Sequence, residues 1–371
     1  MKVLHVISDE NIGGAGILLT NLLRNFDPGR VQSIVALPRE SKLMLRIQEL
    51  GIPTVELEHP CDRFSINSFK ELRQIVKRNE PDLIHANAAL SARLVGKSLR
   101  KKVIHTRHCC FPPTGIWKNR GMRYMGGLWN RRLSDHVIAT ADAAAEDLQR
   151  LGVPREQISV IINGSEKVRE VSEAELESYR QKWRIPKADF LIGICARLER
   201  CKGHDIFLKA AKRLIDRLPS KKLCFLIVGS GTRENALKAL AKELGIEERV
   251  CFTGFVADMA PVYRLLRVNV NCSVGTETSC LALSEGMSAS LPMVVSHYGG
   301  NGAMVGDGKA GILFPPGDDA ALADALERII SDPSLELTMR NAAYERYEQQ
   351  YTAVQMTERL TAVYERLFNE T

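Results

Sequence analysis

Two acidic residues, Glu277 and Glu285, stand eight positions apart in the segment NCSVGTETSCLALSEGMSAS. An apolar run just before them predicts a strand, and a helix is expected to begin near Ser279. Carboxylates there can accept paired hydrogen bonds from vicinal sugar hydroxyls. The first N–H groups of the helix, at Ser279, Cys280 and Leu281, could hold a phosphate. The alternatives are a helix-terminal charge for Glu277, worth about 0.3–1 kcal/mol, and an exposed helix position for Glu285.

Basic residues follow another apolar run, 190–198, in the segment ICARLERCKG. Arg197 and Lys202 lie five positions apart at the end of this run, and Gly203 comes next. A guanidinium can bind two phosphate oxygens at once, whereas an ammonium adds a compact point charge. The spacing therefore predicts a clamp for a diphosphate, with Arg200 as an extra cation. Ordinary surface charge is the alternative.

A glycine-rich turn that begins with Gly13 and Gly14 follows the first apolar run and opens an amphipathic stretch. Glycines at such a turn let backbone N–H groups approach a phosphate or a sugar ring. The turn does not match the GxGxxG fingerprint, and no clear ribose-binding acid follows the second apolar run. These departures disfavour a nicotinamide-dependent dehydrogenase. A purely structural tight turn remains the alternative.

Two histidines lie on the apolar run 102–108, the second of them at its end. His105 is expected to be structural, whereas His108 lies at the tip of the strand, where an imidazole can donate to a sugar hydroxyl or a backbone carbonyl. A zinc site that combines them with Cys109 and Cys110 is disfavoured, because alternating strand positions would separate the ligands.

Apolar runs alternate with amphipathic stretches along the whole chain. The expected strands are 3–8, 33–38, 53–58, 82–87, 102–108, 136–141 and 158–164, then 190–198, 224–231, 250–255, 268–273 and 292–297. This alternation predicts an α/β fold of two Rossmann-like domains, each with a parallel sheet covered by helices on both faces. Ligands of such sheets bind at the carboxyl ends of the strands, where the candidate residues lie.

The restart of the pattern divides the chain. The first domain is expected over 1–165 and the second over 185–350, and the strandless segment 165–188 is expected to be a linker with a short helix. A final helix, about 352–371, is expected to pack back on the first domain. Two such domains that face each other would hold a cleft between them.

Composition narrows the class of protein. The chain has 371 residues, of which 45% are hydrophobic and 26% charged, values that exclude a disordered or collagen-like protein. Nine scattered cysteines without a CxxC fit reduced thiols rather than disulfides or zinc. The sequence has no run of about 18 apolar residues and no signal-peptide pattern, so a cytoplasmic, unprocessed chain is expected.

The positive charge is concentrated in one region. Residues 70–132 hold 15 basic and 3 acidic side chains, a net +12, whereas the whole chain carries +7. Such a surface attracts an anionic partner: nucleic acid, phospholipid headgroups or a phosphorylated substrate. No recognised nucleic-acid motif accompanies the charge, so nucleic acid is not expected as a partner.

Within this region, residues 115–132 read GIWKNRGMRYMGGLWNRR. Aromatic rings favour the bilayer interface, and each basic side chain near an anionic surface contributes about 1 kcal/mol. The segment therefore predicts an anionic membrane surface as a partner. Alternatively, its apolar residues pack on the sheet and only its charges are exposed. Gly121, Gly126 and Gly127 disfavour a single continuous helix.

Taken in order, these motifs resemble those of the retaining glycosyltransferases of family 4, which have the two-domain architecture called GT-B. The resemblance covers nearly the whole chain. It rests on Gly13-Gly14, the His108 strand tip, Asn163-Gly164, ARLERCKG at 196–203, GSG at 229–231, TGF at 253–255, the pair Glu277 and Glu285, and GGN at 299–301.

The resemblance implies a role for each candidate. Arg197 and Lys202 would neutralise the diphosphate of a nucleotide-sugar donor. Glu285 would bind the ribose, Glu277 would hold the hydroxyls of the transferred sugar, and His108 would contact that sugar. The other donor-binding positions would be Gly13, Gly14, Gly229, Phe255, Val256, Ser279, Cys280 and Leu281, with Phe255 and Val256 cradling the base and the backbone at Gly14 approaching the diphosphate or the acceptor.

The resemblance also implies retention by same-face attack, without a metal ion or other cofactor. The departing phosphate would take the acceptor's proton. The first acid departs from the family pattern, because Thr278-Ser279-Cys280 follow it where Gly-Phe-Gly is common. The sugar is therefore left open.

The expected enzyme transfers a hexosyl group from a UDP-sugar to a cell-envelope glycan, glycolipid or lipid-linked acceptor. It would be cytoplasmic, at the inner face of the cell membrane. A sugar-nucleotide 2-epimerase and a non-catalytic nucleotide-sugar-binding protein are the alternatives on the same fold.

Overall fold

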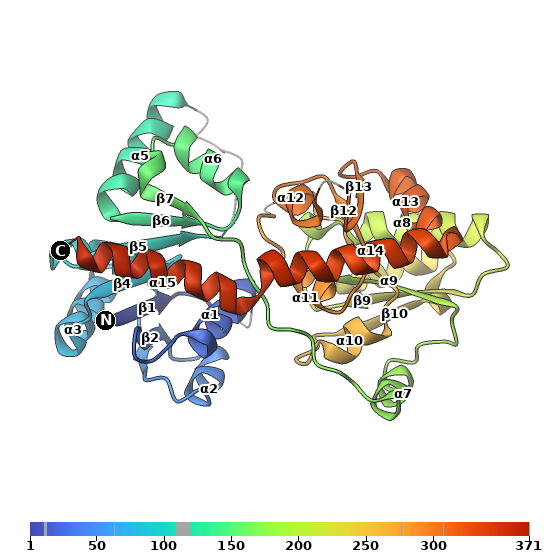
Figure 1. Ribbon diagram of the computed structural model, residues 1–371, viewed down its shortest axis with the longest axis horizontal. Coiled ribbons are helices and arrows are strands. Elements are labelled where there is room, and N and C mark those ends of the chain that lie inside the picture. The colour runs from blue at the N-terminus through green and yellow to red at the C-terminus, as the bar shows by residue number, and fades with distance from the viewer. Residues whose placement is uncertain (11–12, 63, 109–118, 276, 307, 371) are drawn as a thin grey trace. The chain divides into compact units, whose positions relative to one another are not determined.

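The computed structural model describes residues 1–10, 13–62, 64–108, 119–275, 277–306 and 308–370. The chain divides into two compact units, of which the first comprises Met1–Ser165 together with Ala353–Thr371 and the second Glu166–Thr352 (Figure 1). Each unit holds one parallel sheet and several helices, so the expected α/β class with two Rossmann-like domains is confirmed.

The first unit is built on a seven-stranded parallel sheet in the order β3-β2-β1-β4-β5-β6-β7. Its strands are β1 Lys2–Ile7, β2 Gln32–Pro38, β3 Thr54–Leu57, β4 Leu83–Asn87, β5 Lys102–Arg107, β6 His136–Ala139 and β7 Ile158–Val160. Each strand falls on one of the seven expected apolar runs. The strand order reverses beside β1, and at such a reversal the loops at the carboxyl ends diverge and leave room for a ligand.

Helices connect these strands. They are α1 Gly14–Asn25, α2 Leu43–Gln48, α3 Ile66–Asn79, α4 Leu90–Ser98, α5 Arg120–Leu133 and α6 Asp142–Arg150, and α15 Ala353–Asn369 completes the unit. Helix α15 packs against α1, and its Leu360 and Tyr364 are buried in the same apolar cluster. Arg30 adds ion pairs to Glu358 and Glu365 of α15, at 2.9 and 2.8 Å.

Helix α5 is one continuous helix, so the expectation that its glycines would interrupt it is wrong. Asn119 caps its first turn by accepting hydrogen bonds from the N–H groups of Gly121 and Met122. Gly127 lies against the end of α6, where a Cβ atom would stand 1.2 Å from the carbonyl oxygen of Leu151. The glycine therefore permits close helix packing, and this gain offsets its poor helix propensity.

The second unit is built on a six-stranded parallel sheet in the order β10-β9-β8-β11-β12-β13. Its strands are β8 Phe190–Cys195, β9 Leu223–Val228, β10 Val250–Gly254, β11 Val268–Asn271, β12 Met293–Ser296 and β13 Gly311–Phe314. Five fall on the expected apolar runs, but β13 was not expected. It has only four residues, and they begin with a glycine, so the strand signal in the sequence is weak.

The helices of this unit are α7 Glu173–Lys182, α8 His204–Arg217, α9 Glu234–Glu243, α10 Ala260–Leu265, α11 Leu281–Ser288, α12 Asn301–Val305, α13 Asp319–Ser331 and α14 Pro333–Arg346. Helix α7 is the short helix expected within the linker segment 165–188, and it packs against α10 with its Leu176 buried. The second unit therefore begins at Glu166 rather than near 185. A π-helical turn, Tyr347–Tyr351, separates α14 from α15.

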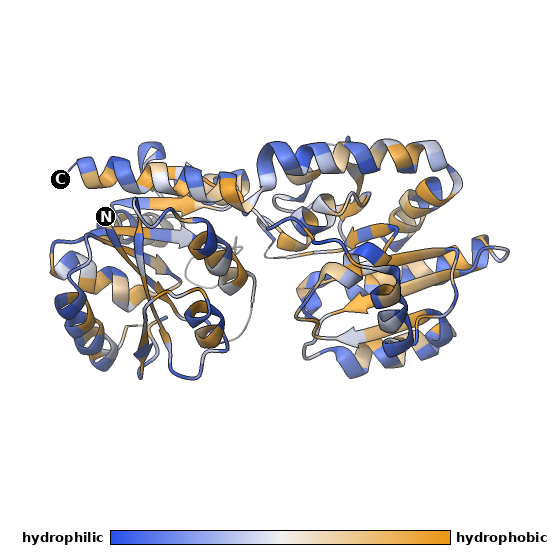
Figure 2. Cartoon of the chain, turned by 60° about the horizontal axis from the view of Figure 1, so that its bottom comes forward, coloured by the Kyte–Doolittle hydropathy of each residue, from blue (hydrophilic) through white to orange (hydrophobic). Residues whose placement is uncertain are grey.

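The strands form the apolar core of each unit. In the second unit a large cluster of buried residues joins β8, β9 and β11 to α8 and α13. Figure 2 shows this pattern as orange strands and helices that turn blue faces outward. Within the described residues, no helix is both long and apolar enough to cross a bilayer.

Two neighbouring strands of the first unit, β1 and β4, carry buried histidines. His5 on β1 is paired in register with His85 on β4, and their rings lie 5.6 Å apart. His85 hydrogen-bonds Thr106 and Tyr364 through its two ring nitrogens. Burial lowers the pKa of His5 to about 3, and burial followed by the charge of His5 lowers the pKa of His85 well below its usual range.

Acid is therefore expected to destabilise the first unit. A histidine binds a proton near pH 6.5 in the unfolded chain, but His5 does so only near pH 3 in the folded one. Protonation below pH 6.5 therefore favours the unfolded chain. The contribution of neutral His5 to the free energy of unfolding is complete above pH 6.5 and is lost as the pH falls. At pH 5 the loss is about 2 kcal/mol for a single such histidine. Hydrogen exchange of the β1 amides at pH 7 and 5 measures it, with exchange rates corrected for pH.

The variant His5→Gln should lose less stability than the wild type between the two pH values. The exposed His297 of the second unit provides the control, because His297→Gln should leave the loss unchanged. An equal loss in His5→Gln and wild type would show that His5 does not carry the effect.

Candidate active site

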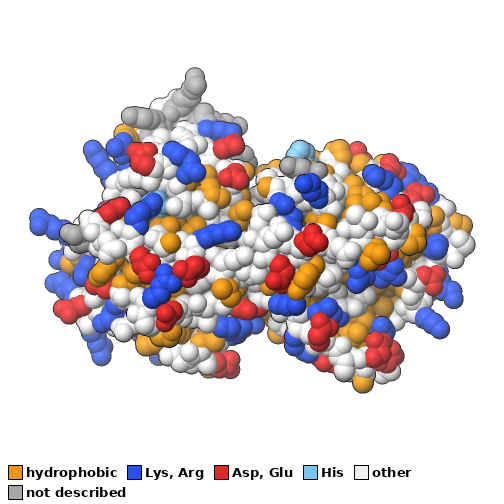
Figure 3. All heavy atoms as spheres, in the orientation of Figure 1, with side chains coloured by type: hydrophobic (Ala, Val, Ile, Leu, Met, Phe, Trp, Pro, Cys, Tyr) orange, Lys and Arg blue, Asp and Glu red, His pale blue; other side chains and the backbone are white. Residues whose placement is uncertain are grey.

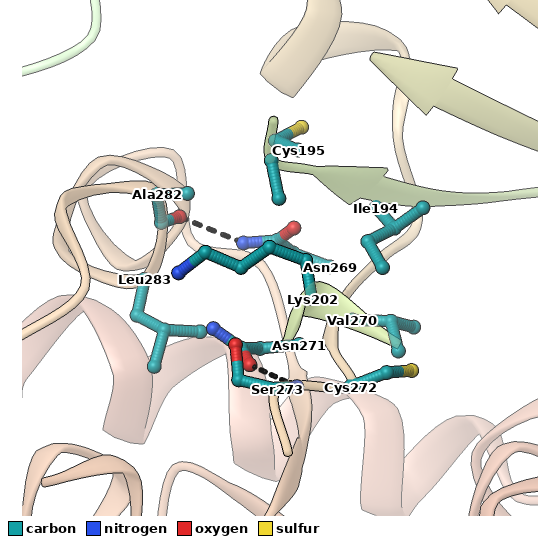
Figure 4. Close-up of a pocket in the computed structure, with 11 residues that line it drawn as sticks. Ile194, Cys195, Lys202, Asn269, Val270, Asn271, Cys272, Ser273, Ala282 and Leu283 are labelled. Atoms are coloured by element: carbon teal, nitrogen blue, oxygen red, sulfur yellow. Dashed lines mark hydrogen bonds between the residues drawn. The ribbon is translucent and has the colours of Figure 1, made fainter. Parts of the chain in front are cut away.

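A small pocket opens at the carboxyl ends of β8 and β11 in the second unit (Figure 4). Lys202 extends across it between Asn269 and Asn271, which are side chains of β11. Lys202 closes the short 3-10 helix Arg200–Lys202 that follows β8, and Ser273 and the start of α11 complete the lining. The ammonium group of Lys202 therefore lies largely buried at the carboxyl ends of the strands, where the site was predicted.

Lys202 and Glu277 form an ion pair. The Nζ of Lys202 donates to the Oε2 of Glu277 at 2.6 Å, and their side chains are only 17% and 8% exposed. Burial disfavours ionisation of Glu277, but the ammonium of Lys202 and the hydrogen bonds from Lys202, Ser273 and Asn271 outweigh it, so its pKa lies below the usual value. The two residues were expected to have separate partners, and the structure instead brings them together.

A polar network lies beneath this pair. The Oγ of Ser273 donates to the Oε2 of Glu277 at 2.7 Å, and the Oγ of Ser296 donates to the Ser273 carbonyl. The Nδ2 of Asn301 donates to the Oδ1 of Asn271 and to the Ser296 carbonyl. All four supporting side chains are buried, so they hold Glu277 in one orientation. Through Asn301, the GGN segment at 299–301 is part of this hydrogen-bond network.

Two glycines let the backbone close around the pair. Gly203 has a φ of +67°, and a Cβ there would stand 2.1 Å from the carbonyl oxygen of Cys272. Gly299 has a φ of +57°, and a Cβ there would stand 2.1 Å from the carbonyl oxygen of Glu277. No other residue type fits these positions without a shift of the backbone.

The second acid, Glu285, lies on α11 and has a partner that sequence reasoning missed. The hydroxyl of Tyr263 donates to its Oε2 at 2.7 Å. Tyr263 belongs to α10 and is 1% exposed. A tyrosine in an apolar stretch such as PVYRLL looks like a core residue, so the sequence carries no signal for this contact.

Helix α11 begins at Leu281 with Cys280 as its N-cap, two residues later than expected. The thiol of Cys280 accepts a hydrogen bond from the Nδ2 of Asn271 at 3.3 Å. Burial, and then the charge of Glu277, raises the pKa of this thiol to about 12, so it stays protonated at neutral pH. Ser279 is 6% exposed and follows Glu277 closely.

The remaining donor-side candidates lie in loops after their strands. Arg197 is exposed beyond β8. Gly229 follows β9 with a φ of +134°, in contact with the backbone of Ala196. Phe255 follows β10 and is 55% exposed, an uncommon position for an aromatic ring, and Val256 next to it is half-buried.

The first unit holds the other candidates. The Nε2 of His108 bonds the Oδ1 of Asn87 at 3.0 Å, so the ring carries a hydrogen on that nitrogen. Burial lowers the pKa of His108 to about 4 and keeps it neutral at pH 7. Gly13 is the N-cap of α1, and Gly14 is exposed at its first turn. His105 bonds the carbonyl of Ala86, as expected of a structural residue.

Two of the sequence predictions involve residues that the structure does not describe. Cys109 and Cys110, the remaining ligands of the disfavoured zinc site, lie outside the described residues, as does the start of the segment 115–132. Among the described residues, no group of three or more His, Cys, Asp or Glu is arranged to hold a metal ion.

Two family models match the chain and together cover most of it. The model for group 1 glycosyl transferases matches residues 175–346, and the model for glycosyltransferase family 4 matches residues 12–166. The two matches correspond closely to the two units of the structure. The chain therefore belongs to the family 4 glycosyltransferases, and it is an enzyme that transfers a sugar.

Relatives of known assignment agree. EpsD of Bacillus subtilis (strain 168), assigned as a glycosyltransferase, is 28% identical over 314 residues, which are 81% of this chain and 80% of that protein. The D-inositol 3-phosphate glycosyltransferase of Corynebacterium urealyticum is 32% identical over 238 residues, 61% of this chain and 56% of that protein.

Solved structures share the fold. HepE of Anabaena, solved in complex with UDP-glucose, superposes with a TM-score of 0.85 at 21% identity, covering 99% of this chain and all of HepE. WaaG, a glycosyltransferase involved in lipopolysaccharide biosynthesis, superposes with a TM-score of 0.69 at 15% identity, covering 97% of this chain and 99% of WaaG. At these identities the likeness establishes the GT-B fold.

Proposed function

We propose that this enzyme is a retaining hexosyltransferase that takes its sugar from a UDP-sugar and delivers it to a cell-envelope glycan, glycolipid or lipid-linked acceptor. The buried pair of Lys202 and Glu277 at the carboxyl ends of the strands carries this proposal. The cation could offset the charge of the diphosphate of a donor, and the carboxylate could accept hydrogen bonds from the sugar hydroxyls. The UDP-glucose complex of HepE, a structure of the same fold, supports the choice of donor.

The two charges act on different parts of the donor. An ammonium has three donor hydrogens, and Glu277 takes one, so Lys202 can keep this partner and still bind a phosphate oxygen. Arg197, exposed in the loop after β8, adds a second cation for the diphosphate. Glu277 holds the sugar hydroxyls, and Glu285 holds the ribose. Phe255 and Val256 contact the base, with Gly229 and residues 279–281 completing the donor site.

The chemical step follows from these charges. The acceptor hydroxyl attacks the anomeric carbon as the bond from that carbon to the phosphate oxygen breaks. The departing phosphate takes the hydroxyl proton, and the products are the glycoside and UDP. Lys202 and Arg197 stabilise the charge that develops on the diphosphate, which is electrostatic catalysis by preorganised groups. In the first unit, neutral His108 and the backbone at Gly13 and Gly14 are proposed to contact the transferred sugar and the acceptor.

A metal ion is not required in this proposal, because the two basic side chains supply the positive charge. Transfer should then persist in the presence of EDTA.

The experiment is a mass-spectrometric screen of UDP-, GDP- and ADP-sugars, with and without lipid-linked and glycan acceptors. Acceptor-dependent release of UDP supports the proposal. Conversion of the nucleotide sugar without any acceptor would favour an epimerase, and binding without turnover would favour a non-catalytic role. Transfer to a soluble inositol phosphate, the substrate named for the Corynebacterium urealyticum relative, would replace the proposed acceptor class.

The acceptor class is supported by the surface of α5. Met125 and Trp129 lie one turn apart on this helix and are 54% and 62% exposed. Arg131 and Arg132, in the last turn of the same helix, are also exposed. Helix α4 packs against both α3 and α5, and the exposed Lys77 and Arg78 extend the basic surface along α3. Figure 3 shows blue Lys and Arg side chains gathered over the end of this unit that carries α3. We propose that this surface binds anionic lipid at the cytoplasmic face of the membrane.

Binding to vesicles tests this surface. The protein should sediment with vesicles of phosphatidylcholine and phosphatidylglycerol at low salt, and high salt should release it. The variant with Arg131→Ser and Arg132→Ser should bind about tenfold to thirtyfold more weakly, since each basic side chain near the membrane contributes about 1 kcal/mol.

The exposed pair Lys221 and Lys222 of the second unit provides a matched control. Serine at both positions removes the same charge and should leave vesicle binding unchanged. Equal weakening by the two double variants would indicate a general charge effect, and no sedimentation of the wild type would exclude the membrane proposal.

A further inference from the structure

We propose that Tyr263 is a positioning residue that orients Glu285 for selection of ribose over deoxyribose. The inference rests on the proposed function, because it takes Glu285 as the ribose ligand. Its basis is the hydrogen bond from the Tyr263 hydroxyl to the Oε2 of Glu285, at 2.7 Å.

The two residues approach from different elements. Tyr263 lies in the second turn of α10, and Glu285 lies near the middle of α11. Tyr263 is 1% exposed, so water does not compete for its hydroxyl. Burial, and then the charge of Glu285, raises the pKa of Tyr263 well above its usual value. The phenol therefore keeps its proton at physiological pH and remains a donor to the carboxylate.

This contact determines how the carboxylate presents its oxygens. The last torsion of a glutamate side chain is broad, so a solvated carboxylate samples many orientations of its plane. A hydrogen bond that holds Oε2 fixes this plane. Two adjacent ribose hydroxyls can donate to one carboxylate only in a narrow range of orientations, because both donors must meet lone pairs at once. Fixing the plane therefore favours a ligand with both hydroxyls over one that lacks either.

A third side chain, a thiol, lies near this contact. Cys195, the last residue of β8, lies next to both Tyr263 and Glu285. Burial, and then the charge of Glu285, raises the pKa of its thiol, so it stays neutral at physiological pH. The phenol of Tyr263 gives the charged Glu285 carboxylate a short, directed hydrogen bond.

The test compares binding of UDP and 2′-deoxy-UDP by titration calorimetry, with GDP and 2′-deoxy-GDP measured in parallel. The variant Tyr263→Phe removes only the hydroxyl and keeps the ring that packs in the core. We expect it to bind UDP about fivefold to tenfold more weakly than the wild type, a loss within the range typical of one hydrogen bond. We also expect the ratio of UDP to 2′-deoxy-UDP affinity to fall towards one.

This affinity ratio separates positioning from a merely structural role, because loosened packing would weaken both nucleotides alike. Tyr351→Phe is the matched control. Tyr351 is another buried tyrosine of the second unit, and its hydroxyl bonds the carbonyl of Ala303. This control should leave both affinities unchanged. In the double variant with Glu285→Gln, loss of the Tyr263 hydroxyl should weaken binding no further, since the two groups act through one carboxylate.

The outcomes distinguish two claims, that Glu285 binds the ribose and that Tyr263 orients Glu285. If Glu285→Gln lowers the affinity ratio and Tyr263→Phe does not, Glu285 is the ribose ligand and the positioning role is wrong. If Glu285→Gln leaves the affinity ratio unchanged, the assignment of Glu285 in the proposed function is itself wrong. Equal weakening of both nucleotides by Tyr263→Phe would also overturn the positioning role.

Discussion

Replacing Lys202 with methionine should lower kcat/KM by about 100-fold or more, equivalent to at least about 2.7 kcal/mol of transition-state stabilisation. Glu277→Gln should have a similar effect. Each variant removes one charge from the proposed donor site, and each leaves a buried charge without its partner. Steady-state kinetics with the donor found in the nucleotide-sugar screen measure both.

Measurements of unfolding stability distinguish a loss of catalysis in these variants from a loss of folded structure. Each single variant should also unfold more easily, because it strands a buried charge, and the double variant Lys202→Met, Glu277→Gln should recover part of this loss while staying inactive. Lys209→Met, at an exposed position of α8, controls for the loss of a lysine. Near-normal kcat/KM in both single variants would contradict the assigned site.

Gly203→Ala should cost the second unit about 3 kcal/mol or more, which corresponds to a fall in Tm of roughly 10 °C for a unit of this size. The added Cβ would lie 2.1 Å from the Cys272 carbonyl oxygen, and the backbone is in the left-handed region. Because Gly203 follows Lys202 directly, nucleotide binding should be lost as well. Differential scanning calorimetry and titration with UDP measure the two effects.

A second glycine with a similar φ separates the steric clash from the backbone strain in the expected destabilisation. Gly245 has a similar φ of +65°, but a Cβ there meets no atom within 4 Å. Gly245→Ala should therefore cost only the backbone strain, about 1–2 kcal/mol. If Gly203→Ala proves no more destabilising than Gly245→Ala, the close approach to Cys272 does not limit this position.

Local pattern explains which parts of the fold could be predicted. Strands such as β8, FLIGIC, and β9, LCFLIV, are buried on both faces, so an unbroken apolar run marks each of them. The strand β13 was not predicted, because four residues that begin with glycine show too little hydrophobic pattern to indicate a strand. The prediction of an interrupted helix at α5 was wrong for a different reason. Gly127 allows the helix to pack closely against Leu151, and helix propensity takes no account of such a tertiary contact.

The same distinction applies to the site. Residue type and place after a strand were enough to propose Lys202, Glu277 and Glu285 as candidates. The ion pair joins residues 75 positions apart, and Tyr263 reaches Glu285 from another helix, so both contacts depend on the packing of the second unit. Sequence spacing shows which groups lie at the edge of a sheet, whereas tertiary packing decides which of them touch.

The place of α15 has a consequence for biosynthesis. Its Leu360 and Tyr364 belong to the apolar core of the first unit, although the whole second unit precedes them in the chain. During translation, a ribosome must therefore finish about 350 residues before this core can close. Until then the nascent first unit exposes the apolar side chains of α1 that α15 later covers. A chaperone that shields these side chains would be needed longest for the part of the protein that is made first.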